Sequence, residues 1–219
     1  MADPKGGLGV VVGGGARDLE LPVDGAAAVV QRHGERYTLP HEIDHHANMR
    51  RLAGAGCERV LAIGSVGGLR PGLGPGTFVC PDDFIALDIP PATGLDGLEA
   101  HRVSGFDAGW RERVVSAFRG HREDLVDGGV YWQTTGPRLE TPAEIRLIAR
   151  DADVIGMTVA SECVAAGELG LAYAAVCIVD NHANGVAETE LTLAEVEAGR
   201  ARNREALAAA LAAAIPGLA

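Results

Sequence analysis

The sequence predicts an α/β protein: one domain of three layers, in which a central mixed β-sheet is flanked by helices. Short apolar runs alternate with longer segments of helical spacing along the whole chain, as in folds whose strands are joined by helices. Several of these runs are unbroken Val, Ile and Ala stretches, typical of strands covered on both faces. The chain has 219 residues, 47% of them hydrophobic, enough for one full core and too few to expect two. No linker or internal repeat divides it, so we expect one domain over residues 1–219.

The expected strands are the apolar runs bounded by turn-forming residues. In chain order they cover residues 8–13, 26–31, 59–63, 77–80 with 84–87, 129–134, 154–157 and 172–179.

The expected helices have apolar residues at helical spacing. They cover residues 43–55, 108–118, 142–150, 161–169 and 193–214. Thr141-Pro142-Ala143-Glu144 is a capping box with proline at the first helical position, and Thr192-Leu193-Ala194-Glu195 repeats the box without the proline. Leu207, Leu211 and Ile215 share one stripe of the last helix, which we expect to pack on the sheet or on a neighbouring subunit.

Charge and cysteine usage narrow the class of partner. The formal net charge of −11 argues against a nucleic-acid partner or an anionic membrane surface, because both need clustered Lys and Arg. The N-terminus has no signal-peptide apolar region, and no apolar run is long enough to span a bilayer. The four cysteines lack metal-ligand spacing and are expected to be reduced core thiols. We therefore expect a cytoplasmic protein that binds a small molecule.

Two glycine-rich segments follow apolar strands, at residues 10–16 and 63–69. Glycines in such turns let backbone N–H groups converge on an anion. Each segment alone is equally compatible with a plain tight turn. Two such turns on adjacent strands predict a shared anion cradle.

Arg32 and His33 close the second expected strand. An arginine at a strand end can grip a phosphate through two charge-assisted hydrogen bonds, and the neighbouring histidine can add a donor. Taken alone, the pair is also compatible with a solvated surface site. The second glycine segment favours the phosphate interpretation.

Glu140 and Asn181 are the candidates for binding a heterocycle. Glu140 lies between a strand and a capped helix, where its carboxylate can accept hydrogen bonds from the N–H edge of a purine. The alternative is a surface carboxylate stabilised by the helix dipole. Asn181 follows the long strand at 172–179, and its carboxamide offers both a donor and an acceptor. The alternative for Asn181 is ordinary turn chemistry.

Asp44-His45-His46 invites a metal interpretation. His45 and His46 fall within an expected helix and point about 100° apart, so they cannot easily face one ion. No second Asp/His cluster has matching spacing. We therefore expect no metal site.

Taken together, these residues resemble the trimeric purine nucleoside phosphorylase and methylthioadenosine phosphorylase family, and most closely its methylthioinosine phosphorylase branch. The resemblance covers residues 28–184. It is carried by Gly136-Pro137-Arg138-Leu139-Glu140-Thr141 and Gly156-Met157-Thr158, with His41-Glu42-Ile43-Asp44-His45-His46-Ala47-Asn48 as a further likeness. It implies a nucleoside phosphorylase-like fold, a homotrimer, no metal or other cofactor, and inorganic phosphate as co-substrate.

The resemblance also implies site residues. Phosphate would be bound by the first glycine turn at Gly15 and by Arg32, His33, the Ser65 backbone and Thr158. Met157 would lie against the ribose, Leu139 beside the purine ring, and Glu140 and Asn181 would hold the base as catalytic residues. In this family an Asn at the purine position goes with 6-oxopurines and an Asp with adenine. A one-residue slip to Asp180 would reverse the preference, whereas Glu140 supports the oxopurine because it can accept from a protonated N1.

The chain departs from the family at Gly15, where the family carries a Ser or Thr hydroxyl that binds phosphate. Loss of such a charge-assisted hydrogen bond costs about 1.5–3 kcal/mol. The chain is also short for the family before Arg32 and around residues 90–105. Three functions are therefore open: phosphorolysis of a purine nucleoside such as 5′-methylthioinosine, inosine or guanosine, a phosphate-independent nucleosidase, and a non-catalytic purine-binding protein.

Overall fold

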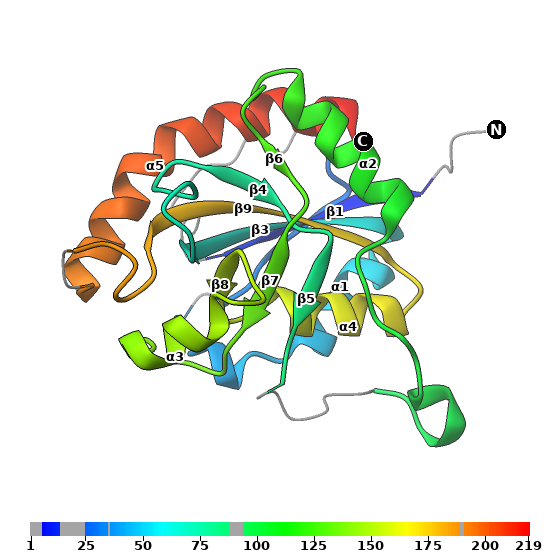
Figure 1. Ribbon diagram of the computed structural model, residues 1–219. Coiled ribbons are helices and arrows are strands. Elements are labelled where there is room, and N and C mark those ends of the chain that lie inside the picture. Colours follow the sequence, from blue (N-terminus) through cyan, green and yellow to red (C-terminus); the bar gives the residue numbers. More distant parts are fainter. Residues whose placement is uncertain (1–5, 14–24, 35, 88–93, 189–190) are drawn as a thin grey trace.

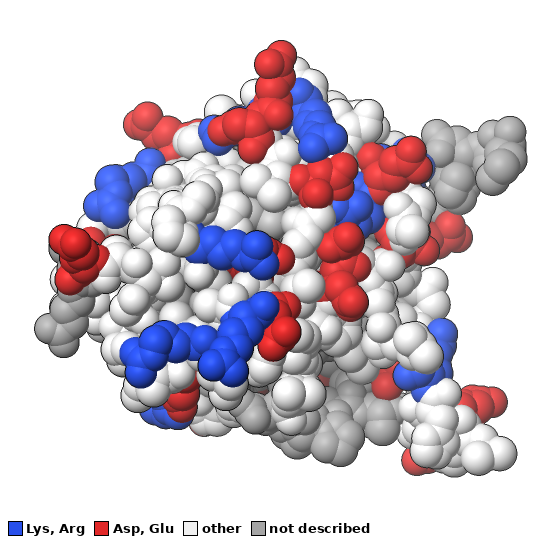
Figure 2. Space-filling view, in the orientation of Figure 1, with Lys and Arg blue, Asp and Glu red and all other residues white. Residues whose placement is uncertain are grey.

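The computed structural model of the protein describes residues 6–13, 25–34, 36–87, 94–188 and 191–219 (Figure 1). Gly15 lies outside the described residues. Within them, none of the helices is both long enough and apolar enough to cross a membrane. On the face in Figure 2, acidic and basic side chains are interspersed rather than gathered into one positive surface.

A nine-stranded mixed sheet forms the centre of the molecule (Figure 1). Its order is β5-β7-β8-β3-β9-β4-β6, and β1 pairs in addition with β2 and β3. The pairs β3–β8 and β4–β9 are antiparallel, whereas β1 runs parallel to both β2 and β3. The strands are β1 (Gly7–Val12), β2 (Ala28–Gln31), β3 (Cys57–Gly68), β4 (Phe78–Cys80), β5 (Asp83–Ile85), β6 (Val126–Asp127), β7 (Val130–Gln133), β8 (Val154–Gly156) and β9 (Ala172–His182).

Helices cover both faces of the sheet, which confirms the predicted α/β fold of three layers (Figure 1). The helix α2 (Ala108–Arg119) packs with α5 (Leu193–Ala214) on one face, and α1 (His45–Gly54) packs with α4 (Val159–Glu168) on the other. The remaining helix, α3 (Pro142–Ile148), packs near β8 in a smaller hydrophobic cluster. Short 3-10 helices occur at Pro40–Glu42, Gly97–Ala100 and Ile215–Gly217.

Successive side chains of β1 point to opposite faces of the sheet and so belong to two different hydrophobic cores. Leu8, Val10 and Val12 pack with α2 and α5, whereas Val11 packs with residues of α1 and α4. Such two-sided burial explains why this strand reads as a continuous apolar run. All four cysteines are free and buried, as predicted.

The helix boundaries with cap signals were predicted best. The last helix, α5, has the expected limits, and Leu207, Leu211 and Ile215 are buried against the sheet. Thr141 and Glu144 form the complete capping box of α3. At α5 the Thr192 side chain accepts a hydrogen bond from the Glu195 N–H group. These caps satisfy N–H groups that the first helical turn leaves without partners.

The second glycine segment, predicted as a turn, is instead part of strand β3. This strand continues through Gly64, Ser65 and Gly67 to Gly68 because β9 supplies hydrogen-bond partners along its length. A register shift occurs between Val66 and Gly67. The short strand β6 was not predicted from the sequence.

The pairing aligns four parallel strands at the level where β1 and β2 end, while β3 and β9 continue beyond it. Val12 of β1 is level with Gln31 of β2 and with Ile63 of β3, and Ile63 is level with Val176 of β9. In open α/β sheets ligands bind at the edge where the carboxyl ends of the strands lie. Arg32 and Gly13 follow directly after β2 and β1, so the sheet places them side by side.

Candidate active site

One pocket at this edge is lined both by predicted phosphate-binding residues and by predicted base-binding residues. It contains about 790 Å³ of empty space, a figure that includes open solvent at its mouth. Of the predicted site residues, the pocket is lined by Arg32, His33, Ser65, Leu139, Glu140, Met157, Thr158 and Asn181. The structure therefore brings all of the described candidates together.

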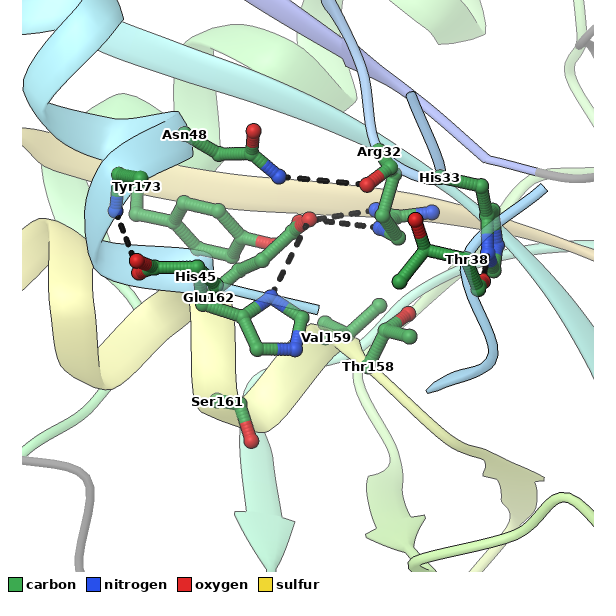
Figure 3. Close-up of polar contacts among 12 residues, drawn as sticks. Arg32, His33, Thr38, His45, Asn48, Thr158, Val159, Ser161, Glu162 and Tyr173 are labelled. Atoms are coloured by element: carbon green, nitrogen blue, oxygen red, sulfur yellow. Dashed lines mark hydrogen bonds and ion pairs between the residues drawn. The ribbon is translucent and has the colours of Figure 1, made fainter. Parts of the chain in front are cut away.

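The Arg32 side chain is almost fully buried beneath the pocket, where it forms a two-pronged ion pair with Glu162 of α4 (Figure 3). Arg32 Nε donates to Glu162 Oε1 at 2.6 Å, and Nη2 donates to Oε2 at 2.8 Å. Nη1 donates to the carbonyl oxygen of Ile63 at 2.9 Å. The guanidinium has five N–H groups, and these three bonds leave one hydrogen on each terminal nitrogen for a ligand.

The carboxylate of Glu162 has further partners in the same network. The Tyr173 hydroxyl donates to Oε2 at 2.8 Å, and His45 Nδ1 lies 3.8 Å from Oε1. Burial alone would raise the pKa of Glu162, but Arg32, with a smaller contribution from His45, outweighs it and holds the pKa below its usual range. Burial likewise acts to lower the pKa of Arg32, and Glu162 raises it above its ordinary value. The pair is therefore charged on both sides at neutral pH, and its net charge is zero.

Gly13 allows Arg32 to reach this position. A Cβ atom at Gly13 would overlap Nη1 of Arg32 and lie 3.0 Å from the carbonyl oxygen of Ile63. The guanidinium thus lies directly against the end of β1, which only a residue without a side chain permits.

His33 lies at the rim of the phosphate end with a defined tautomer. Its Nδ1 is 2.8 Å from the carbonyl oxygen of Thr38, which can only accept, so Nδ1 carries the hydrogen. The ring stacks on Tyr37 at a centroid distance of 4.6 Å. Burial lowers the pKa of His33, and the nearby cations Arg32 and Arg200 add to this. At neutral pH its Nε2 is therefore an acceptor rather than the donor that the sequence suggested.

The Thr158 hydroxyl is available to a ligand. Thr158 is the N-cap residue of α4, yet its side chain does not cap the helix. Instead the Tyr131 hydroxyl accepts from the N–H groups of Thr158 and Val159 at 3.2 and 3.4 Å, and Gln133 Oε1 accepts from the Ser161 N–H group. The Thr158 side chain is thus left facing the pocket, where a phosphate oxygen could accept from it.

Glu140 and Asn181 lie at the other end of the pocket. Glu140 Oε1 accepts from the Thr134 hydroxyl at 2.7 Å, which orients the carboxylate and leaves Oε2 for another donor. Asn181 Nδ2 donates one hydrogen to the carbonyl oxygen of His182 at 2.8 Å, and its second hydrogen remains. Asn184, which follows β9, donates a hydrogen bond to the backbone oxygen of Glu140 and so connects the segments that carry Asn181 and Glu140.

Asp180 does not take the place of Asn181 in the pocket. Its side chain is buried, accepts hydrogen bonds from Ser65 Oγ and from Asn203 Nδ2 of α5, and does not line the pocket. The carboxamide rather than the carboxylate therefore faces a ligand.

The site also depends on three residues that were not predicted from the sequence: Glu162, Tyr131 and Arg200. Glu162 carried one signal, because a carboxylate stands among the apolar residues of α4. Such a buried acid needs a cation. Its partner, Arg32, is 130 residues away in the sequence, so no local pattern could reveal the pair.

The two histidines at the start of α1 have different partners. His45 faces Glu162, whereas His46 Nε2 lies 2.7 Å from Glu168. The carboxylate of Asp44 caps α1 by accepting from the Ala47 N–H group. Across the described part of the chain, no group of three or more His, Cys, Asp or Glu side chains could hold a metal ion.

This pocket at the edge of the sheet combines a buried arginine with a carboxylate and a carboxamide, groups that can bind an anion and a heterocycle. The chain belongs to the phosphorylase superfamily, whose family model matches residues 19–216. The predicted family resemblance is thereby confirmed.

Curated relatives agree with this assignment. The chain is 42% identical over 189 residues to a protein named "Probable 6-oxopurine nucleoside phosphorylase" from Archaeoglobus fulgidus, covering 84% of this chain and 77% of the relative. It is 39% identical to a "Probable S-methyl-5'-thioinosine phosphorylase" from Xanthomonas campestris, covering 77% of this chain and 71% of the relative. It is 35% identical to the "6-oxopurine nucleoside phosphorylase" of Pyrococcus furiosus, covering 88% and 78%.

Solved structures share the fold. Methylthioadenosine phosphorylase from Schistosoma mansoni, solved in complex with adenine, aligns with a TM-score of 0.81 and 22% identity. The alignment covers 97% of this chain and 91% of that structure. This likeness supports the arrangement of sheet and helices described above.

Proposed function

We propose that the protein catalyses the reversible phosphorolysis of purine nucleosides with a 6-oxopurine base, giving the free base and a ribose 1-phosphate. The observation that carries this proposal is that Glu140 and Asn181 line the same pocket as Arg32, His33, Ser65 and Thr158. A base and an anion can therefore be held together on the two sides of one sugar.

The phosphate end acts by positioning the nucleophile. Arg32 offers two remaining N–H groups, Thr158 offers its hydroxyl, and the backbone at Ser65 lies beside them. Because Glu162 and Ile63 fix the guanidinium, little freedom is lost when phosphate binds. The neutral His33 can accept a hydrogen bond through Nε2 from a protonated phosphate oxygen.

The base end acts by stabilising the leaving group. As the glycosidic bond lengthens, positive charge develops on the sugar and negative charge on the purine. The second N–H of Asn181 can donate to N7 or O6, where that charge accumulates. Oε2 of Glu140 can accept from N1–H of a 6-oxopurine, a hydrogen that adenine lacks. Met157 and Leu139 supply apolar contacts beside the sugar and the ring.

The test is a screen of inosine, guanosine, adenosine and their 5′-methylthio analogues, each with and without inorganic phosphate. We expect base release from the 6-oxopurine nucleosides only when phosphate is present, together with a ribose 1-phosphate product. Equal release without phosphate would instead identify a nucleosidase. Tight base binding by calorimetry with no cleavage of any nucleoside would identify a binding protein.

We also propose a cytoplasmic homotrimer, as the family resemblance implies. Two exposed leucines, Leu87 and Leu147, border a second hollow beside Glu140, and exposed apolar surface next to a site favours contact with another subunit. Light scattering is expected to give three times the chain mass of 22.6 kDa. A mass of one chain at micromolar concentration would refute the trimer.

A further inference from the structure

Arg200 enters the pocket from an element that the family resemblance does not implicate. The helix α5 crosses β9 closely at Gly199, where a Cβ atom would overlap the carbonyl oxygen of Asp180. This close crossing places the next residue, Arg200, at the wall of the pocket, which Val196 and Ser65 also line. About 29% of its side chain is exposed, whereas the side chain of Arg32 is 2% exposed.

Neighbouring side chains hold Arg200 without enclosing it. Its Nε lies 3.4 Å from Ser65 Oγ and 3.8 Å from Asp180 Oδ2, and its Nη1 lies 3.2 Å from Glu197 Oε1. Among the described residues, none accepts a hydrogen bond from Nη2 of Arg200. The Glu197 side chain is 63% exposed, and exposed ion pairs of this kind are weak.

The charge of the pocket gives Arg200 a particular role. Among the described lining residues, Arg32 and Arg200 are the two with a permanent positive charge. The charge of Arg32 is balanced by Glu162 in a buried pair, and burial lowers the pKa of His33, which favours the neutral ring. Arg200 also lies beside two carboxylates, but its side chain is partly exposed and its nearer partner, Glu197, is at the surface, so its charge is less enclosed than that of Arg32.

We propose that Arg200 is a phosphate-binding residue of this pocket, which swings from Glu197 to the bound anion. It contacts Ser65 Oγ, and its guanidinium can supply a charge-assisted donor to an anion in the pocket. The inference rests on the proposed phosphorolysis, because phosphate is the anion which that reaction requires.

A purely structural role would also place Arg200 near the buried Asp180. In that case loss of Arg200 would destabilise the protein and leave phosphate binding as it is. Asp180 already accepts from Ser65 and Asn203, so its carboxylate has partners without Arg200. Comparing Asp180→Asn with the double variant Asp180→Asn/Arg200→Gln measures the effect of Arg200 where no buried charge needs balancing.

The experiment measures phosphate affinity in two independent ways. Titration of phosphate is followed by calorimetry, without turnover, and by the phosphate KM at saturating inosine. The variants are Arg200→Gln, Arg200→Lys and the Asp180→Asn pair, with Arg204→Gln as the matched control because Arg204 is exposed on the same helix and lines no described pocket. Inosine 5′-monophosphate is tested as a competing ligand, since a nucleoside 5′-phosphate presents the same anion on the sugar.

We expect Arg200→Gln to weaken phosphate binding about tenfold or more, equivalent to about 1.4 kcal/mol, with the inosine KM nearly unchanged. Arg200→Lys should restore part of the affinity, and Arg204→Gln should match the wild type. Unchanged phosphate affinity in Arg200→Gln and in the double variant would overturn the proposal. A loss confined to inosine 5′-monophosphate would also overturn it, by assigning Arg200 to the 5′ side of the sugar. Absence of phosphate-dependent cleavage in the wild type would refute the proposed reaction, while the calorimetric comparison would still decide the role of Arg200.

Discussion

Replacing Glu162 by Gln tests whether the buried ion pair with Arg32 supports the site. The substitution keeps the size of the side chain but removes its charge. The Gln amide can accept from one of the two Arg32 donors, whereas its own NH₂ group faces the other donor. Arg32 would then hold a buried charge without a counter-charge, because both side chains are almost fully enclosed.

The expected loss of stability is large. Removing one partner of a buried pair costs about 3–5 kcal/mol. For a domain of this size each kcal/mol lowers Tm by about 2–4 °C, so Tm should fall by about 6–20 °C. Because the guanidinium would also lose its fixed orientation, the phosphate KM should rise in the fraction that remains folded.

Thermal and urea unfolding measure the stability, and initial rates at several phosphate concentrations measure the site. Glu197→Gln is the control for the stability measurement alone, since its carboxylate is largely exposed and its loss should cost less than about 1 kcal/mol. The double variant Arg32→Met/Glu162→Leu replaces the pair by apolar side chains, so it should recover much of the stability and lose phosphate-dependent activity. A cost below 1 kcal/mol for Glu162→Gln with an unchanged phosphate KM would refute the reasoning.

Three further predictions concern individual residues. Gly13→Ala should raise the phosphate KM, because the added Cβ would displace Nη1 of Arg32; steady-state kinetics check this, and an unchanged KM would show that the guanidinium is not needed where it lies. Asn181→Asp should reduce activity on inosine about tenfold or more and favour adenosine, since a carboxylate cannot donate to O6 but can accept from the amine of adenine. The measurement is the ratio of kcat/KM for the two nucleosides, and an unaltered ratio would contradict the prediction. Burial lowers the pKa of His33 from 6.5 in the folded protein, so the unfolded chain takes up this proton at a higher pH. The stability that His33 contributes above pH 6.5 should therefore decline as pH falls through the folded pKa. His33→Asn should make the free energy of unfolding less dependent on pH between 6.5 and 5, and an identical slope would show that His33 does not cause the decline.

The fold was largely predictable because its signals are local. Unbroken Val and Ile runs identified β1 and β9, and Thr192 marked the start of α5. The glycine segment after Ile63 misled the prediction, since its extended conformation depends on pairing with β9, more than 100 residues further along the chain. Local propensity carries no information about such a partner.

The site was predictable as a set of residues but not as a network. Glu140 and Asn181 were identified with their shared pocket. The pairing of Arg32 with Glu162 and the contact of Arg200 with Ser65 join residues more than 100 positions apart. These two contacts depend on the packing of α4 and α5 against the sheet.

The continuity of strand β3 has a consequence for substrate selection. Ile63 of this strand accepts a hydrogen bond from Arg32 through its carbonyl oxygen, and Gly67 of the same strand is level with Asn181 of β9. In the proposed reaction, one continuous strand would therefore fix the separation between the residue that binds phosphate and the residue that binds the base. Insertions or deletions in this strand would disturb phosphate binding and base binding at once. A new substrate specificity is therefore more easily reached by replacing the side chains around the strand.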